Sequence, residues 1–300
     1  MIMNIIKDIK KLHVGKVIEN AYMKDYTTYK VGGKVICIVY PEDEQSLIKL
    51  LCYIKANSIK YKIIGNGSNV IFNDSGFNGV IIKLDNFNHL NIINNKITVG
   101  AGYMLNKLAL RVSRLGLTGM EFATGIPGTV GGAVYMNAGA YKTDMGYIIT
   151  SVKVLTPDLE IKVMKNKDLD FHYRSSFLQK NNDYICLEAT ISLIKGNPDE
   201  IMELIEERKK RRIETQPLEY PSAGSVFRNP EGDFAGRLIE ELGFKGKSIG
   251  GATVSEKHAN FIVNSGNAKG EEIKELINEI KNKIKEKYNI ELKVEQEFVD

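Results

Sequence analysis

Cysteine is scarce in this chain of 300 residues, in which Cys37, Cys52 and Cys186 lie far apart. Their number is odd and their spacing is irregular, so they indicate neither a disulfide framework nor the paired cysteines of a zinc site. Such sparse use of cysteine is typical of a reducing, intracellular compartment. The four histidines show no metal-ligand spacing either, and we expect no metal site.

Long apolar runs are also missing. No stretch approaches the roughly 18 apolar residues that suggest a membrane-spanning helix. The first residues, Met1–Lys11, mix isoleucine with aspartate and lysine, and they lack the apolar core and the cleavage site of a signal peptide. We therefore expect a cytoplasmic protein that does not contact a membrane.

Charge of one sign is in only small excess, because the net charge is +4. This excess helps to attract an anionic ligand but is too small to indicate nucleic acid binding. The basic run Arg208–Arg212 either complements the carboxyl end of a helix or attracts a diphosphate. It lacks the interleaved aromatic side chains of a nucleic acid platform, so we expect no nucleic acid partner.

Two familiar nucleotide-binding motifs are absent. The stretch Gly65–Asn69 is followed by Val70, where the Rossmann pattern requires glycine. The stretch Gly246–Ser248 resembles the end of a Walker A loop, but Glu241 stands where the first glycine of that loop belongs. The sequence thus supports neither a Rossmann fold nor a P-loop.

Hydrophobic periodicity predicts a chain of mixed helices and strands. Strands are expected over residues 35–41, 61–64, 70–72, 80–84, 97–100, 148–155, 160–163, 184–193 and 290–299. Helices are expected near residues 47–54, 103–115, 197–212, 233–242 and 273–284. Asn197, Pro198 and Glu200 form a clear helix start. We therefore place a domain boundary beside them, near Gly196.

Two glycine-rich stretches are candidate sites for a phosphate. Gly65–Asn69 follows a short apolar strand, and its glycines allow a tight turn in which backbone amides can approach an anion. An ordinary Asn-Gly hairpin turn explains the same residues. Gly125–Gly139 is more specific, since it combines small residues with a proline and with Thr129 as a hydroxyl donor. Its alternative is a glycine-rich crossing in the core.

Arg174, Ser225 and Glu295 are candidate catalytic residues, with Glu297 as a rival of Glu295. A fixed guanidinium can polarise a carboxylate that is conjugated to a double bond, and it stabilises the enolate-like charge that forms when hydride is added. A hydroxyl can then donate the proton. Each residue also has a structural interpretation, as an ion-pair partner, a turn serine or a solvated strand residue. We expect a structural role for His258.

These motifs, in this order, resemble the UDP-N-acetylenolpyruvoylglucosamine reductase family. The matching stretches run from about residue 27 to the C-terminus and comprise residues 27–33, 64–69, 125–141, 173–176, 221–230, 235–239 and 250–264. Val294 stands before Glu295 where family members often have proline. The short connection between Ser176 and Tyr184 is similar to the shorter subclass, which lacks an inserted substrate loop.

The resemblance implies an α+β fold with a two-lobed FAD-binding domain of the vanillyl-alcohol-oxidase (PCMH) type. This domain is expected over residues 29–196, with lobes of about 29–85 and 86–196, after an N-terminal segment of residues 1–28. A C-terminal α+β substrate-binding domain is expected over residues 197–300, and its last strand returns to the active site.

The resemblance also implies an activity and a set of site residues. NADPH reduces FAD, which then reduces the enolpyruvyl ether of a UDP-sugar to UDP-N-acetylmuramate for peptidoglycan synthesis. Arg174 polarises the substrate carboxylate, Ser225 donates the proton and Glu295 assists. Substrate contacts are expected from Tyr173, Tyr220 and Asn229. The expected cofactor-binding residues are Gly65, Asn66, Gly67, Ser68, Asn69, Gly125, Ile126, Pro127, Gly128, Thr129, Gly131, Gly132, Asn137, Ala138 and Gly139.

Neither glycine-rich stretch contains histidine, which favours non-covalent FAD. An alternative is another FAD-dependent sugar oxidoreductase on the same FAD domain, which has no use for Ser225 and Glu295. A non-enzymatic binder of anions or nucleic acid is a third interpretation, suggested by the basic run Arg208–Arg212. The oligomeric state is not predicted by any of these features.

Overall fold

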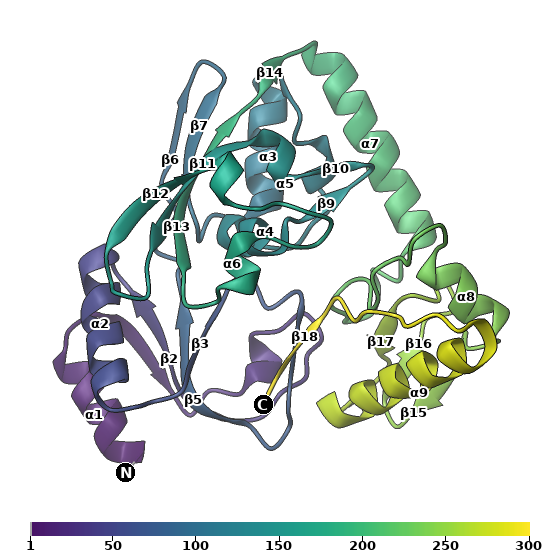
Figure 1. Cartoon of the computed structure of the whole chain (residues 1–300), viewed down its shortest axis with the longest axis horizontal. Coiled ribbons are helices and arrows are strands. Elements are labelled where there is room, and N and C mark those ends of the chain that lie inside the picture. Colours follow the sequence, from purple (N-terminus) through teal and green to yellow (C-terminus); the bar gives the residue numbers. More distant parts are fainter. Residues whose placement is uncertain (1) are drawn as a thin grey trace. The chain divides into compact units, whose positions relative to one another are not determined.

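The computed structural model describes residues 2–300 (Figure 1). Met1, which we included in the N-terminal segment 1–28, lies outside the described residues. The chain divides into two compact units. The first contains the described residues up to Glu19 together with Cys37–Asn66 and Gly79–Lys210. The second contains Asn20–Ile36, Gly67–Asn78 and Arg211–Asp300.

The two units divide the chain differently from the domain boundaries expected after residues 28 and 196. Residues 20–36 and 67–78 belong to the second unit because Tyr29, Val31 and Ile71 are buried in its apolar core. Helix α7 (Pro198–Thr215), expected to open the C-terminal domain, lies mostly in the first unit. The units therefore alternate along the sequence.

A mixed four-stranded sheet forms one part of the first unit. Its order is β1 (Gly15–Glu19), β2 (Val35–Pro41), β5 (Phe77–Lys83) and β3 (Tyr61–Ile64). Strand β1 is antiparallel to β2, and β3 is parallel to β5. Neither β1 nor helix α1 (Ile2–Lys11) was expected from the sequence. Helix α2 (Glu44–Ala56) confirms the helix predicted near residues 47–54. It buries Leu47, Leu50, Leu51 and Ile54, and the Asp43 side chain caps its first turn.

An antiparallel five-stranded sheet forms the other part of the first unit. Its order is β12 (Ile161–Lys165), β11 (Ile149–Leu155), β13 (Ile185–Ser192), β7 (Lys96–Gly100) and β6 (Leu90–Ile93). The four strands predicted here are confirmed to within one or two residues, whereas β6 was not expected. Helix α3 (Leu105–Arg114) buries Leu105, Leu108 and Val112, and α4 (Val130–Met136) packs on β13 and β7.

Short elements complete the first unit. They are β8 (Leu117–Thr118), which pairs with β14 (Ile194–Lys195), the hairpin of β9 (Gly139–Ala140) and β10 (Thr143–Asp144), and helices α5 (Met145–Ile148) and α6 (Phe177–Lys180). Among residues 2–300, none of the helices is both long and apolar enough to cross a bilayer.

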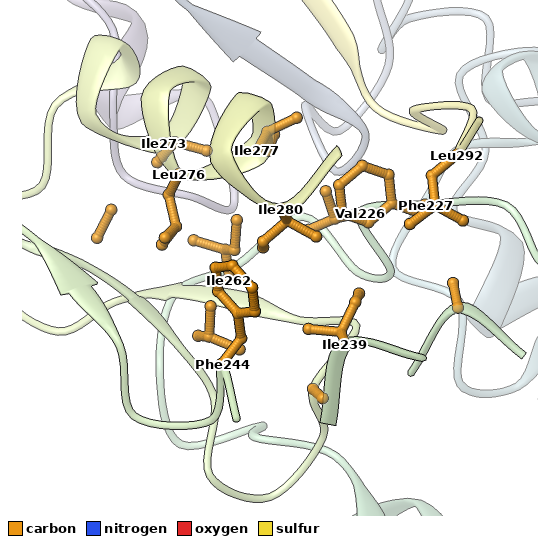
Figure 2. Close-up of a cluster of buried hydrophobic side chains, with 14 of the residues drawn as sticks. Val226, Phe227, Ile239, Phe244, Ile262, Ile273, Leu276, Ile277, Ile280 and Leu292 are labelled. Atoms are coloured by element: carbon orange, nitrogen blue, oxygen red, sulfur yellow. The ribbon is translucent and has the colours of Figure 1, made fainter. Parts of the chain in front are cut away.

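The second unit is built around the long helix α9 (Gly270–Tyr288), which packs on an antiparallel sheet of three short strands. These strands are β15 (Ser248–Ile249), β16 (Ala252–Val254) and β17 (Ile262–Asn264). Figure 2 shows Leu276 and Ile280 of α9 among Phe244, Ile262 and Ile239, the last from helix α8 (Ala235–Glu241). Each such buried side chain stabilises the fold by roughly 1.5–3 kcal/mol.

The C-terminal segment of the second unit is less regular than the sequence predicts. The strand expected over residues 290–299 is wrong for most of its length, since only β18 (Glu297–Val299) is a strand, parallel to β4 (Val70–Phe72). Before it, Val294 makes a single antiparallel bridge to Phe227. The apolar Leu292 is instead buried in the core of the unit, so packing rather than a sheet positions this part of the segment.

Candidate functional site

The second glycine-rich stretch is partly helical in the first unit. We expected a loop over Gly125–Gly139, but Val130–Met136 form helix α4. The Thr129 side chain caps this helix by accepting a hydrogen bond of 3.4 Å from the Gly132 amide, so it acts here as an acceptor. Asn137 ends the helix in a left-handed conformation with φ of 43°. A true loop remains over residues 125–128.

The start of the first glycine-rich stretch lies against this region. The Asn66 side-chain amide donates a hydrogen bond of 2.6 Å to the Pro127 carbonyl. A side chain at Gly65 would collide with the Thr129 hydroxyl, so only glycine allows this close approach. Residues from both predicted stretches are therefore brought together within one unit.

The hairpin interpretation of the first stretch does not fit the strand pairing. Strand β3, which precedes it, pairs with β5, whereas β4, which follows it, pairs with β18. In the second unit, Gly67 is buried and its carbonyl accepts a hydrogen bond of 3.1 Å from the Thr28 amide, and Ser68 is half-buried. Asn69 donates from its side chain to the Glu295 carbonyl at 3.1 Å and accepts at its own carbonyl from the Glu297 amide at 2.9 Å.

A cavity of about 370 Å³ lies in the first unit beside the Asn66 and Thr129 side chains. It is lined by Asn66, Lys83, Asp85, Asn88, Gly102, Tyr103, Met104, Lys107 and Thr129. The two ammonium groups suit an anionic ligand, and the aromatic, amide and hydroxyl groups suit a nucleotide. This donor set fits the diphosphate and the ring of FAD.

Lys83 is the residue of this cavity that the sequence analysis missed most clearly. It lies within the apolar strand β5 and is buried, with a relative exposure of 7%. Its ammonium donates a hydrogen bond of 2.5 Å to the Gly65 carbonyl and lies 3.4 Å from the Asp85 carboxylate. A lone lysine in an otherwise apolar strand was the available signal, because a buried charge needs such partners.

Arg174 lies at the tip of a tight turn in the first unit. The His172 amide donates a hydrogen bond of 3.0 Å to the Ser175 carbonyl, and the Ser175 amide donates one of 3.0 Å to the His172 carbonyl. Arg174 adopts a left-handed φ of 53°, which is uncommon for a residue other than glycine. Its guanidinium donates a hydrogen bond of 2.7 Å to the Gly139 carbonyl, at the end of the second glycine-rich stretch. The Asn137 side-chain amide donates to the His172 carbonyl at 2.8 Å and thereby connects the turn with the same stretch.

Ser225 and Glu295 lie on neighbouring segments of the second unit. The Glu295 amide donates a hydrogen bond of 2.8 Å to the carbonyl of Val226, the residue after Ser225. The Arg228 amide donates to the Lys293 carbonyl at 2.9 Å in the same antiparallel arrangement. Glu297 lies farther along, where it pairs with β4. Glu295 thus lies on the segment that pairs with the Ser225 loop, whereas Glu297 lies in the strand that pairs with β4.

The three residues expected to contact substrate are at the surface. Tyr173 in the first unit and Tyr220 in the second are 53% and 49% exposed. The Asn229 side-chain oxygen accepts a hydrogen bond of 3.1 Å from the Ala235 amide, so it holds the start of α8. The Tyr173 ring lies 5.3 Å from the Arg174 guanidinium, a distance at which a cation is attracted by an aromatic face.

Other candidate groups have structural surroundings. Arg208 of the basic run lies over the Tyr141 ring at 4.4 Å. Burial raises the pKa of the Cys37 and Cys186 thiols to about 12, so neither is a reactive thiolate. In the part of the chain that the structure describes, no group of three histidine, cysteine, aspartate or glutamate side chains could hold a metal ion.

Two parts of the chain match known protein families. Residues 35–164 match the FAD binding domain family, and residues 216–299 match the C-terminal domain of UDP-N-acetylenolpyruvoylglucosamine reductase. The fold class expected from the sequence, α+β with a FAD-binding domain of the vanillyl-alcohol-oxidase type, is confirmed by these matches and by a solved structure.

Similarity to individual proteins extends over nearly the whole chain. UDP-N-acetylenolpyruvoylglucosamine reductase of Anoxybacillus flavithermus is 45% identical over 294 residues, which are 98% of this chain and 97% of that protein. The protein of the same name from Bacillus licheniformis is 44% identical over 98% of both chains. The crystal structure of the reductase from Thermus caldophilus is 34% identical, with a TM-score of 0.78 over 95% of this chain and 98% of that one.

Proposed function

Because the chain belongs to the UDP-N-acetylenolpyruvoylglucosamine reductase family, we propose that it reduces the enolpyruvyl ether of UDP-N-acetylglucosamine to UDP-N-acetylmuramate. This reaction is a step in making peptidoglycan precursors. The chain is a flavin oxidoreductase, and we propose NADPH as its hydride donor and the cytoplasm as its location. The observation that carries the proposal is the pairing of the Ser225 loop with the Glu295 segment.

FAD supplies the hydride-transfer chemistry that no side chain offers. We propose that the first unit holds it non-covalently through the cavity beside Asn66 and Thr129. Lys83 and Lys107 would offset the charge of the diphosphate. The backbone of Gly125–Gly128 and the first turn of α4 would approach the ligand where glycine leaves room.

Arg174 would bind the substrate carboxylate. Its guanidinium is held by the Gly139 carbonyl, and a guanidinium is a planar group whose N–H donors suit a carboxylate. Hydride addition to the double bond moves negative charge toward that carboxylate. Arg174 stabilises the charge in the transition state, which is where such stabilisation raises the rate.

Ser225 would donate the proton to the other carbon of the double bond. A hydroxyl is a weak acid, so its proton must be directed at the reacting atom by the surrounding structure. Glu295, on the neighbouring segment, would assist at the substrate carboxylate. Tyr173, Tyr220 and Asn229 would contact other parts of the sugar nucleotide. In this proposal, most of residues 29–196 serve FAD, Tyr173 and Arg174 among them serve the substrate, and residues 197–300 serve the substrate.

Ser225→Ala tests the proposal because the two half-reactions can be followed separately by flavin absorbance. We expect reduction of the flavin by NADPH to stay near the wild-type rate. Reoxidation by the enolpyruvyl sugar nucleotide should slow by about 10²–10⁴, the range for a lost general acid. Ser222→Ala, in the same loop, is the matched control and should leave both rates within about threefold of wild type. A parallel fall of both half-reactions in Ser225→Ala would refute the assigned role.

A further inference from the structure

Gln296 lies between two carboxylates, yet its side chain faces the interior. Gln296 stands at a bend directly before β18, and it is buried whereas Glu295 and Glu297 are partly exposed. Gln296 is only 4% exposed. A buried amide needs hydrogen-bond partners, because leaving it without them costs roughly 1–3 kcal/mol.

The partners of the Gln296 amide nitrogen belong to the loop that carries Ser225. The nitrogen donates to the carbonyls of Ala223 at 3.1 Å and Gly224 at 3.2 Å, and the Ser225 carbonyl lies at 3.5 Å. One side chain thus contacts three consecutive carbonyl groups, the last of them on Ser225 itself.

Packing supports this part of the loop at Ala223, which is buried in the core of the unit, but not at Gly224. Gly224 adopts a left-handed φ of 75°, and a side chain added there would meet nothing within 4 Å. The residues after Ser225 are held differently, since the Val226 amide donates to the Asn260 carbonyl at 2.9 Å. Gln296 therefore fixes the backbone at Gly224, directly before Ser225, where the loop is otherwise open.

The other end of the Gln296 amide determines which way the side chain faces. Its oxygen and the hydroxyl of Tyr29 are both buried, and neither has a hydrogen-bond partner in the described part of the chain. The Tyr29 side chain lies beside Gln296, and a hydroxyl can donate a hydrogen bond to an amide oxygen. The opposite orientation of the amide would place its oxygen against three carbonyl oxygens, which repel it.

We propose that Gln296 is a positioning residue that holds the Ser225 hydroxyl in the orientation needed for proton donation, with Tyr29 fixing the orientation of the Gln296 amide. The inference rests on the proposed role of Ser225. Gln296 touches neither the substrate nor the flavin in this proposal, and it acts only through the backbone of residues 223–225.

A double-mutant cycle in the full-length flavoprotein tests this inference. Gln296→Met keeps the length of the side chain and removes its hydrogen bonds. We expect the variant to reduce its flavin with NADPH at the wild-type rate and to reoxidise with the enolpyruvyl sugar nucleotide about 10- to 100-fold more slowly, as for a misplaced catalytic group. In a Ser225→Ala background, Gln296→Met should change that reoxidation rate by less than about twofold, because the hydroxyl it positions is gone.

The outcomes separate this inference from the proposed function. If Ser225→Ala slows reoxidation but Gln296→Met does not, or if the two effects multiply, the inference is overturned and the role of Ser225 stands. If Ser225→Ala reoxidises normally, the assigned role of Ser225 fails and the inference fails with it. If both half-reactions slow in Gln296→Met, the residue is merely structural.

Tyr29→Phe provides a second variant should Gln296→Met fail to fold. It removes one hydroxyl and leaves the Gln296 amide free to turn. We expect reoxidation by the sugar nucleotide to slow by about 2- to 10-fold, the loss of one hydrogen bond, while reduction by NADPH is unchanged. If a folded Tyr29→Phe protein reoxidises at the wild-type rate, Tyr29 does not fix the orientation of the Gln296 amide. If both half-reactions slow, Tyr29 supports the fold and does not act through the Ser225 loop.

Discussion

Arg174 contacts the Gly139 carbonyl. Of the two basic side chains, only the guanidinium of arginine can keep this contact and bind a carboxylate at the same time. One nitrogen of Arg174 already donates to the Gly139 carbonyl. Lysine concentrates its charge on a single ammonium, which cannot hold this carbonyl and also offer a planar fork. The identity of the side chain, and not only its charge, should therefore matter for reduction of the substrate.

We predict that Arg174→Lys slows reoxidation by the enolpyruvyl sugar nucleotide by about 10²–10³, as when a transition-state hydrogen-bond donor is lost. Reduction of the flavin by NADPH should not change. Stopped-flow absorbance measures both steps, and Arg208→Lys, over the Tyr141 ring, controls for the loss of an arginine elsewhere. Wild-type reoxidation in Arg174→Lys would exclude a bidentate role.

The two carboxylates of the C-terminal segment differ in their neighbours. Glu295 lies opposite Val226, whereas Glu297 pairs with β4. We predict that Glu295→Gln slows reoxidation by about 10-fold or more, in the range of a group that assists proton transfer, and that Glu297→Gln has a much smaller effect. The same stopped-flow assay compares the two variants, and the reverse order would make Glu297 the working carboxylate.

At the scale of single elements, helix α4 places two adjacent glycines in different surroundings. A side chain at Gly131 would come within 2.9 Å of the Ala101 side chain and 3.2 Å of its carbonyl oxygen. At Gly132 the nearest atom is the Thr129 hydroxyl oxygen, at an ordinary 3.5 Å. Of these two positions, only 131 requires glycine for the stability of the fold.

We predict that Gly132→Ala raises the free energy of unfolding of the flavin-free protein by about 0.5–1 kcal/mol, because alanine favours a helix. Gly131→Ala should lower it by about 1–3 kcal/mol through overpacking. Urea unfolding measures both. If the Gly132 backbone contacts FAD, the Gly132→Ala variant should also bind FAD more weakly, although the flavin-free variant is more stable than the wild type. A loss of stability in both variants would contradict the packing described for α4.

The strongest local signals in the sequence gave correct elements. The spacing of Leu47, Leu50 and Leu51 predicted α2, and Asn197 with Pro198 predicted the start of α7. Helix α4 was missed because Gly131 and Gly132 favour a loop locally, whereas the Thr129 cap and packing on β13 stabilise a helix. The last strand was overestimated because an apolar residue such as Leu292 can be buried without joining a sheet.

At the scale of the whole molecule, the alternating units could not be predicted from local patterns. Residues 20–36 join the second unit through contacts such as the hydrogen bond of 3.0 Å from the Asn264 side chain to the Tyr29 carbonyl. These residues are 235 positions apart in the chain. The same limit applies to Gln296, since nothing in its polar surroundings in the sequence indicates burial beside the Ser225 loop. Motif resemblance, by contrast, indicated the family correctly.

The stability of the molecule should depend on pH through His258. Burial lowers the pKa of this imidazole, and its Nδ1 accepts a hydrogen bond of 3.2 Å from the Asn260 amide, which requires the neutral ring. The unfolded chain takes up a proton near the ordinary histidine pKa of about 6.5. Below that pH the unfolded state binds more protons, so the free energy of unfolding falls until the lower, folded pKa is reached.

We therefore predict that the wild-type protein loses free energy of unfolding as the pH falls below about 6.5, and that His258→Gln loses less over the same interval. Urea unfolding at several pH values measures the difference. His13→Gln, at an exposed position, should keep the wild-type slope. Equal slopes for wild type and His258→Gln would show that this imidazole does not titrate between the folded and unfolded states.

The most direct test of the central claim is an anaerobic titration of the wild-type protein followed by its visible spectrum. We predict a yellow protein that is bleached by NADPH and regains its colour when a stoichiometric amount of the enolpyruvyl sugar nucleotide is added, with UDP-N-acetylmuramate as the product. A flavin that stays bleached with this substrate, and regains its colour only when oxygen is admitted, would contradict the account.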